Sequence, residues 1–311
     1  MNMNNPTTNL LGRRSVLAML GGVAAAGLLP ARWALAEGAA TLALTFDGDA
    51  LVVAGAQVWR HDLSGGGAAS LATPRAHIRA LACHPARAGR LFAALDSGGL
   101  ERSDDGGLTW RAASGGLPQA QVTALAIAVG APDTVYAAVA DDGLWRSEDA
   151  GALWTFVMDR PWLAEAEREI QSLASVNLAS GMGGIWIYAG TDQGVTRVPD
   201  CFCRWQDVVA GDAMDALVAG TPPAPEAPLP EGEPVLALAS AMAAPERLVA
   251  ALPTGLWASA DGGVNWARVS DIAASALAVH PTDPNRIAAA TTDGVLLSQD
   301  GGTTWAALSI T

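Results

Sequence analysis

The sequence contains no lysine. All 18 of its basic residues are arginine, and 31 acidic residues give it a formal net charge of −13. The absence of lysine excludes a Schiff-base lysine and the phosphate-binding lysine of a P-loop. Nucleic acid and anionic lipid are poor ligands for so acidic a chain, because both carry negative charge. We therefore expect no nucleic-acid partner, and a basic protein is a better match.

Cysteine is scarce as well. Cys83, Cys201 and Cys203 are too few for a disulfide framework in 311 residues, and no Cys-x-x-Cys-His haem attachment site is present. Cys201 and Cys203 are two residues apart, so in extended chain both side chains point to the same side. We expect a loop with two free thiols, with no metal and no cofactor. A Cu(I) site and a strained disulfide stay open as alternatives for this pair.

Residues 1–36 are typical of an export signal. Arg13-Arg14 precede an apolar run from Val16 to Leu29, and Ala34-Leu35-Ala36 offers a small-residue cleavage site. The twin arginine is similar to the signal of the Tat pathway, with an ordinary Sec signal as the alternative. The apolar run is short for a retained membrane anchor. Cleavage would leave 15 arginines against 31 acidic residues, a net charge of −16. We expect a periplasmic or secreted protein with no integral membrane segment after cleavage.

An eight-residue motif, Ser-x-Asp-x-Gly-x-Thr-Trp in its fullest form, recurs along the chain. Its aspartate can accept hydrogen bonds from loop amides, its glycine adopts positive φ without steric cost, and its tryptophan can anchor the returning strand. Four good copies and one degenerate copy place the aspartate and tryptophan at Asp105 and Trp110, Asp149 and Trp154, Asp200 and Trp205 (the degenerate copy), Asp261 and Trp266, and Asp300 and Trp305. Recurrence of this kind indicates a repeat architecture.

The repeat unit predicts the fold. Each unit of roughly 40 residues has an apolar strand containing Leu-Ala or a near variant, a second strand, a glycine-led turn into a third strand, and a fourth strand opened by the motif tryptophan. Six such units predict an all-β, six-bladed β-propeller over residues 37–311, and a seventh blade would need a unit that we do not find. The first unit has no motif at 63–69. We expect the ring to close by packing the face of blade one against blade six.

Two insertions interrupt the repeats, near 157–171 and near 209–234. In the first, Pro161 is followed by Ala, Glu and Arg residues, which predict one or two helical turns. The second contains six prolines between 222 and 234, which predict an extended, acidic segment. Long insertions in compact domains are either functional or disordered, and the sequence leaves both alternatives open for each.

A row of arginines is the candidate binding site. The third strands of the first four units end in Arg60, Arg102, Arg146 and Arg197. Equal positions on consecutive blades trace an arc, and guanidinium groups suit bidentate contacts with carboxylates. We interpret the row as a partner-binding surface; the alternative is that each arginine pairs with nearby acids of the motif. His84 and His280 occupy one repeat position before a proline, and we expect both to be structural.

The eight-residue motif resembles the Asp-box, or BNR, repeat. That repeat is shared by the sialidase-like superfamily, some xyloglucan hydrolases and the photosystem II stability/assembly factor family, and the chain is closest in character to the last. The resemblance implies a propeller fold. It is poorly specific for function, because function lies in sites carried by the fold.

The function that we favour is a non-catalytic scaffold or assembly factor for a protein partner in the periplasm, with a redox enzyme among the candidates because Tat exports folded complexes. The alternative is a carbohydrate-binding protein or a glycoside hydrolase. Sialidase chemistry is disfavoured because the two tyrosines, Tyr136 and Tyr188, lie at packing positions in second strands, and the Phe-Arg-Ile-Pro motif is absent.

Overall fold

Short strands joined by tight turns make up nearly all of the computed structural model, which describes residues 42–178, 184–210, 220 and 225–309. The expected export signal at 1–36 and half of the insertion near 209–234 lie outside the described residues. Within the described part of the chain, no helix is long and apolar enough to cross a membrane.

Six four-stranded antiparallel sheets form the fold, and in each one the strands pair in sequence order. Blade one is β1 (Ala43–Asp47), β2 (Ala50–Ala54), β3 (Val58–Asp62) and β4 (Gly67–Leu71); blade two is β5 (Ile78–Cys83), β6 (Leu91–Leu95), β7 (Leu100–Ser103) and β8 (Arg111–Ala112). Blade three is β9 (Val122–Ile127), β10 (Val135–Val139), β11 (Gly143–Ser147) and β12 (Thr155–Met158). A 3-10 turn, η1 (Pro85–Arg87), lies between β5 and β6.

The second half repeats the pattern. Blade four is β15 (Ile170–Asn177), β16 (Ile185–Thr191), β17 (Gly194–Pro199) and β18 (Gln206–Asp207); blade five is β19 (Ala237–Ala241), β20 (Ala244–Leu252), β21 (Gly255–Ser259) and β22 (Ala267–Ser270). Blade six is β23 (Ala276–Val279), β24 (Ile287–Thr291), β25 (Gly294–Ser298) and β26 (Ala306–Leu308). A separate two-stranded ribbon, β13 (Trp162–Leu163) and β14 (Ala166–Glu167), precedes blade four.

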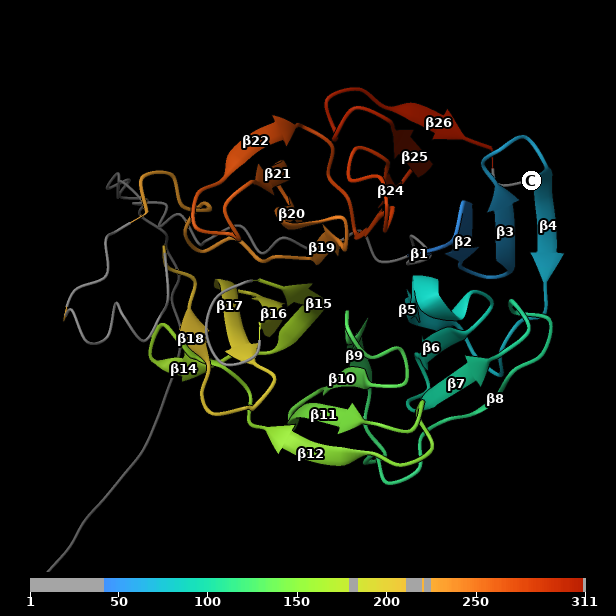
Figure 1. The fold of residues 1–311 in the computed structure, drawn as a ribbon, viewed down its shortest axis with the longest axis horizontal. Coiled ribbons are helices and arrows are strands. Elements are labelled where there is room, and N and C mark those ends of the chain that lie inside the picture. Colours follow the sequence, from blue (N-terminus) through green and yellow to red (C-terminus); the bar gives the residue numbers. More distant parts are fainter. Residues whose placement is uncertain (1–41, 179–183, 211–219, 221–224, 310–311) are drawn as a thin grey trace, which may run out of the picture. The chain divides into compact units, whose positions relative to one another are not determined.

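The six sheets form a closed ring (Figure 1). The innermost strands β1, β5, β9, β15, β19 and β23 are neighbours in that order, and β23 is also a neighbour of β1. This arrangement confirms the predicted all-β, six-bladed propeller. The described chain begins on the inner strand β1 and ends on the outer strand β26. Blade one and blade six are therefore separate sheets, and neither takes a strand from the other end of the described chain.

Packing between facing sheets therefore closes the ring, as the sequence predicts. Leu44, Phe46 and Leu51 of blade one are buried against Ala288 and Val295 of blade six. Similar apolar clusters fill the other blade interfaces. Alternate residues of a strand face opposite sides, so the buried second strands carry small and branched residues on both faces. This explains why the sequence is rich in alanine.

The helical turns predicted near 160–171 are wrong. The segment forms the β13–β14 ribbon, turning through Ala164 (φ 48°) and Glu165 (φ 60°), both in the left-handed region. The Arg168 guanidinium donates hydrogen bonds to the carbonyls of Leu163 (2.9 Å) and Ala164 (3.1 Å), which holds the turn. These contacts outweigh the helix propensity of the Ala, Glu and Arg residues.

Candidate functional site

Four of the eight-residue motifs form the same polar turn, which we call the Ser-x-Asp loop. In blade two, Ser103 Oγ donates to Asp105 Oδ1 (2.8 Å) and accepts from the Gly107 amide (2.8 Å). Asp105 also accepts from the amide (2.9 Å) and the hydroxyl (2.6 Å) of Thr109. Hydrogen bonds from the hydroxyl and amide of Thr109 and from Ser103 favour the carboxylate and lower the pKa of Asp105 to about 2.

The other three loops repeat this geometry. The serines Ser147, Ser259 and Ser298 donate to Asp149, Asp261 and Asp300 over 2.8, 2.7 and 2.8 Å. Each of these carboxylates also accepts from the amide four residues further on, at 2.9, 2.9 and 2.8 Å. The aspartates are therefore engaged in closing their own loops, as expected for a structural role.

The loop tryptophans do more than anchor their own blade. In blades two, three and four, the indole Nε1 donates to a carbonyl of the preceding blade or its exit: Trp110 to Ala72 (2.9 Å), Trp154 to Ala113 (2.8 Å) and Trp205 to Asp159 (2.7 Å). Trp266 and Trp305 donate instead to Gly263 (2.8 Å) and Gly302 (2.9 Å) of their own loops. Three of the five tryptophans thus join consecutive blades.

The predicted arginine row is directed forward, towards the following blade. Arg60 pairs with Asp47 and lies beside the blade-two loop at Gly106. Arg102 donates to the Ala150 carbonyl of blade three (2.7 Å). The Arg146 guanidinium lies 5.4 Å from the ring centroid of Phe202 in blade four. Arg102 and Arg146 also pair with acids of their own motifs, Asp104 (2.9 Å) and Glu148 (3.3 Å), as the alternative to partner binding expects. Partner binding by the row stays a prediction.

Arg197, the fourth arginine of the row, is buried: the residue is only 3% exposed. Its guanidinium stacks 4.4 Å from the Trp186 ring centroid and donates to Tyr188 Oη (3.0 Å), and Tyr188 donates in turn to the Gly262 carbonyl of blade five (2.8 Å). Its Nε and second terminal nitrogen have no hydrogen-bond partner. In this structure Arg197 is a buried part of the interface between blades four and five.

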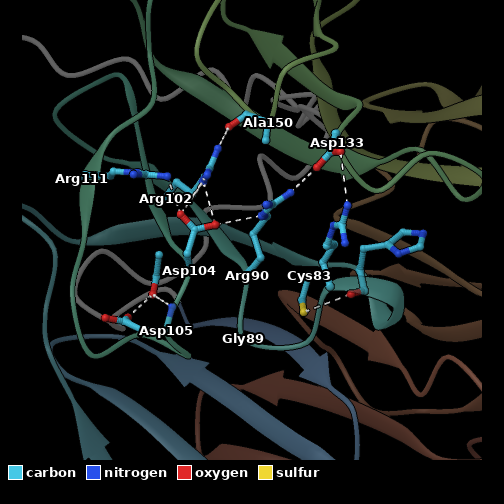
Figure 2. Close-up of polar contacts among 12 residues, drawn as sticks. Cys83, Gly89, Arg90, Arg102, Asp104, Asp105, Arg111, Asp133 and Ala150 are labelled. Atoms are coloured by element: carbon cyan, nitrogen blue, oxygen red, sulfur yellow. Dashed lines mark hydrogen bonds and ion pairs between the residues drawn. The ribbon is translucent and has the colours of Figure 1, made fainter.

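The strongest concentration of cationic side chains lies on blade two. We call Arg87, Arg90, Arg102 and Arg111 the blade-two arginine cluster. Figure 2 shows Asp104 at its centre, contacted by three of these arginines. Asp104 pairs with Arg90 (2.9 Å), with Arg102 (2.9 Å) and with Arg111. Burial alone would raise the pKa of Asp104, but the hydrogen bonds from Arg102 and Arg90 hold the pKa below its ordinary value.

A second carboxylate joins the cluster to blade three. Arg90 also pairs with Asp133, and Arg87 lies 3.7 Å from the same carboxylate. The hydrogen bond from Arg90 is the main cause of the lowered pKa of Asp133. Four guanidinium groups thus face two carboxylates that stay ionised, which leaves excess positive charge on an acidic protein.

The members of the cluster divide into two kinds. The side chains of Arg90 and Arg102 are mostly covered and bind their partners through several nitrogens. The side chains of Arg111 and Arg87 are 63% and 51% exposed, and each pairs through one nitrogen. The remaining N–H groups of these two face solvent, where they can hold a carboxylate or phosphate of a ligand.

Cys201 and Cys203 form a disulfide, so the expectation of two free thiols is wrong. They belong to the degenerate motif, where Val198 stands in place of the serine and Phe202 (φ 53°) in place of the glycine. Cys83 is free, and burial, followed by the nearby Asp47 carboxylate, raises the pKa of its thiol.

The two histidines are occupied within the chain. His84 accepts from the Ala86 amide (3.1 Å) and contacts the Val129 carbonyl (3.1 Å). His280 accepts from the Asp283 amide (3.2 Å) and lies 3.3 Å from Asp49 of blade one. Both contacts agree with the structural interpretation. A central cavity of about 170 Å³ lies at the carboxyl ends of the innermost strands and is lined mainly by apolar residues.

Sequence reasoning missed Arg87, Arg90 and Arg111. For Arg90 a signal was present: in blades two, five and six an arginine directly precedes the second-strand residue that pairs with the motif serine, and Arg247 and Arg286 share this position. Those two contact Asn285 and Asp49 of the next blade, as Arg90 contacts Asp133. Arg87 and Arg111 have no such repeat pattern, so only the fold brings them together.

Comparison with known proteins supports the fold. No protein-family model matches the sequence, and no curated protein matches it. Among solved structures, the GH74 enzyme of Niastella koreensis aligns with 15% identity and a TM-score of 0.55, covering 85% of this chain and 46% of that one. The GH74 xyloglucanase of Xanthomonas campestris aligns with 19% identity and a TM-score of 0.51, covering 84% and 45%. The chain thus spans less than half of either GH74 chain.

A structure of YCF48 bound to D1 peptide is also similar, with 14% identity and a TM-score of 0.49, covering 83% of this chain and 74% of that one. At these identities the GH74 similarities concern the propeller fold alone, and the YCF48 score is too low to support an argument.

Proposed function

We propose that this chain is an exported, non-catalytic propeller of the Asp-box type that binds a protein partner in the periplasm, as a scaffold or assembly factor. The Ser-x-Asp loops are its Asp boxes, and residues 1–36 direct its export through a twin-arginine signal. A redox enzyme exported in folded form is one candidate partner.

One observation carries this proposal: the exposed guanidinium groups of Arg87 and Arg111 in the blade-two arginine cluster. The two exposed side chains lie next to a network of ion pairs in which Arg90 binds Asp104 and Asp133 and Arg102 binds Asp104. Arginine at such a site recognises carboxylates by paired N–H donors. We infer that the partner presents an acidic segment to blade two, in contrast to the basic partner that the net charge of the whole chain favours.

The test is capture of a partner by tagged mature protein from a periplasmic extract. The Arg87→Glu/Arg111→Glu double variant should lose the partner that the wild-type protein retains, and added salt should weaken capture by the wild type. Arg268→Glu is the matched control, because this arginine is also exposed, lies in blade five and pairs with Asp271. Equal melting temperatures of the wild type, the double variant and Arg268→Glu would show that all three proteins are folded. The proposal fails if the folded double variant then retrieves the same partner at the same salt concentration.

A carbohydrate-binding protein is the second candidate, favoured by Trp162. This side chain is 63% exposed on the β13–β14 ribbon, and exposed tryptophans are suited to stacking on a flat ligand. Because one similar structure is a xyloglucanase, xyloglucan oligosaccharides are the natural probe. Binding that is lost in Trp162→Ala and kept in Arg87→Glu/Arg111→Glu would favour this function over the scaffold.

A further inference from the structure

The degenerate loop of blade four is closed in a different way from the four Ser-x-Asp loops. Val198 has no hydroxyl to donate to Asp200, and the disulfide between Cys201 and Cys203 takes the place of the side-chain hydrogen bonds. Both cysteines are exposed. A thiol in solution can therefore approach either sulfur.

Hydrogen bonds outside the disulfide also hold this loop in shape. The Asp200 amide donates to the Ile185 carbonyl (3.1 Å), and the Phe202 amide donates to the Pro199 carbonyl (2.8 Å). On the far side of the bridge, the indole of Trp205 donates to the Asp159 carbonyl (2.7 Å). Because the bridge closes a loop of only three residues, it also removes little conformational entropy from the unfolded chain.

The residue between the cysteines is fixed to the neighbouring blade. The Phe202 ring lies edge-on to Tyr136 of blade three, with centroids 6.0 Å apart, and under the guanidinium of Arg146 at 5.4 Å. Arg204 follows Cys203 directly and is exposed. Asp200 directly precedes Cys201, and Glu148 pairs with Arg146 at 3.3 Å. Cations close to a cysteine stabilise its thiolate and make it a better leaving group.

We propose that Cys201 and Cys203 form a redox-active disulfide that accepts electrons from thiols, with the cysteine pair of an exported protein as substrate. A substrate thiolate attacks one sulfur of the bridge, the bond between Cys201 and Cys203 breaks, and a mixed disulfide forms. The released cysteine leaves as a thiolate and takes a proton from water. The second substrate thiolate then attacks the mixed disulfide. The substrate pair loses two electrons and becomes a disulfide, while Cys201 and Cys203 gain them and become thiols.

This activity differs from the partner binding proposed above, because it needs neither Arg87 nor Arg111. A disulfide that is exposed and contributes little to stability is of the labile, exchange-competent kind. Reoxidation by another disulfide would return the site to its starting state.

The experiment titrates purified mature protein with glutathione redox buffers and counts free thiols by maleimide gel shift. Cys201 and Cys203 should open at glutathione ratios that leave ordinary structural disulfides closed, and the melting temperature of the reduced protein should match that of the oxidised protein. The Cys203→Ser variant should accumulate a mixed disulfide with glutathione at Cys201. Cys83 should stay unlabelled in the folded protein and serves as the internal control.

A kinetic arm separates exchange from a structural role. Arg146→Met should slow opening of the disulfide by glutathione about threefold to tenfold, since it removes the guanidinium that packs on Phe202 between the two cysteines. Arg268→Met in blade five should react at the wild-type rate. The proposal is overturned if the disulfide opens only when the protein unfolds, if reduction lowers the melting temperature, or if Arg146→Met reacts as fast as wild type.

Discussion

The substitution Trp154→Ala tests how the Ser-x-Asp loops hold neighbouring blades together. Trp154 is 3% exposed and packs with Phe92, Ala113 and Leu117 of blade two, and its Nε1 donates to the Ala113 carbonyl. Replacing a buried tryptophan by alanine costs about 3–5 kcal/mol through the cavity that it leaves. The unpaired Ala113 carbonyl adds about 1 kcal/mol or more.

Urea unfolding followed by circular dichroism measures this loss directly. With a shift of about 2–4 °C per kcal/mol for a domain of this size, the melting temperature should fall by about 8–24 °C. Trp154→Phe should cost about 1–2 kcal/mol, because it keeps much of the packing and loses the hydrogen bond. If Trp154→Ala unfolds within 1 kcal/mol of wild type, the tryptophan does not join blades two and three in the way that the contacts indicate.

Three further predictions concern pH, thiol reactivity and export. Hydrogen bonds in their loops lower the pKa values of Asp105 and Asp300 to about 2. The stability that these carboxylates contribute is therefore complete above their ordinary pKa near 4 and is lost as the pH falls towards 2. The melting temperature should fall between pH 4 and pH 2, and it should fall less steeply in Asp105→Asn/Asp300→Asn. Cys83 should react with iodoacetamide much more slowly than a small thiol, because burial raises its pKa, and equal rates would contradict its placement beside Asp47. Replacing Arg13-Arg14 by Lys-Lys should block export through Tat, whereas normal export, judged by fractionation, would favour Sec.

The sequence predicted the propeller because each repeat carries its own local signal. The aspartate, glycine and tryptophan of the eight-residue motif act within one turn, and their spacing fixes where the third strand ends and the fourth begins. Ser103 and Asp105 show the result, with hydrogen bonds of the expected kind. Such local contacts can be inferred from order and spacing alone.

The β13–β14 ribbon could not be predicted in this way. Alanine and glutamate at positions 164 and 165 favour helix in isolation, but both turn through the left-handed region, where Arg168 donates hydrogen bonds to the carbonyls of Leu163 and Ala164. These hydrogen bonds can form only after the turn has brought the Arg168 side chain close to the two carbonyls. Propensity read along the chain therefore gives the wrong element.

The sequence showed that the arginines of the row share one repeat position. It did not show which of them are exposed. The sequence places Arg102 of blade two and Arg197 of blade four at the same repeat position, but their surroundings depend on the facing blade. Arg102 meets a loop carbonyl at Ala150, whereas Arg197 is covered by Trp186 and Tyr188. The register between blades is a property of the fold, so burial at this position could not be inferred from the repeat.

The measurement that tests the central claim most directly is titration of the mature protein with a short polyglutamate peptide by calorimetry at low and at moderate salt. The account predicts binding to wild type that weakens as salt rises, no binding to Arg87→Glu/Arg111→Glu, and unchanged binding to Arg268→Glu. Equal binding by wild type and the double variant, or no binding to wild type at low salt, would contradict the claim that the blade-two arginine cluster receives an acidic segment of a partner.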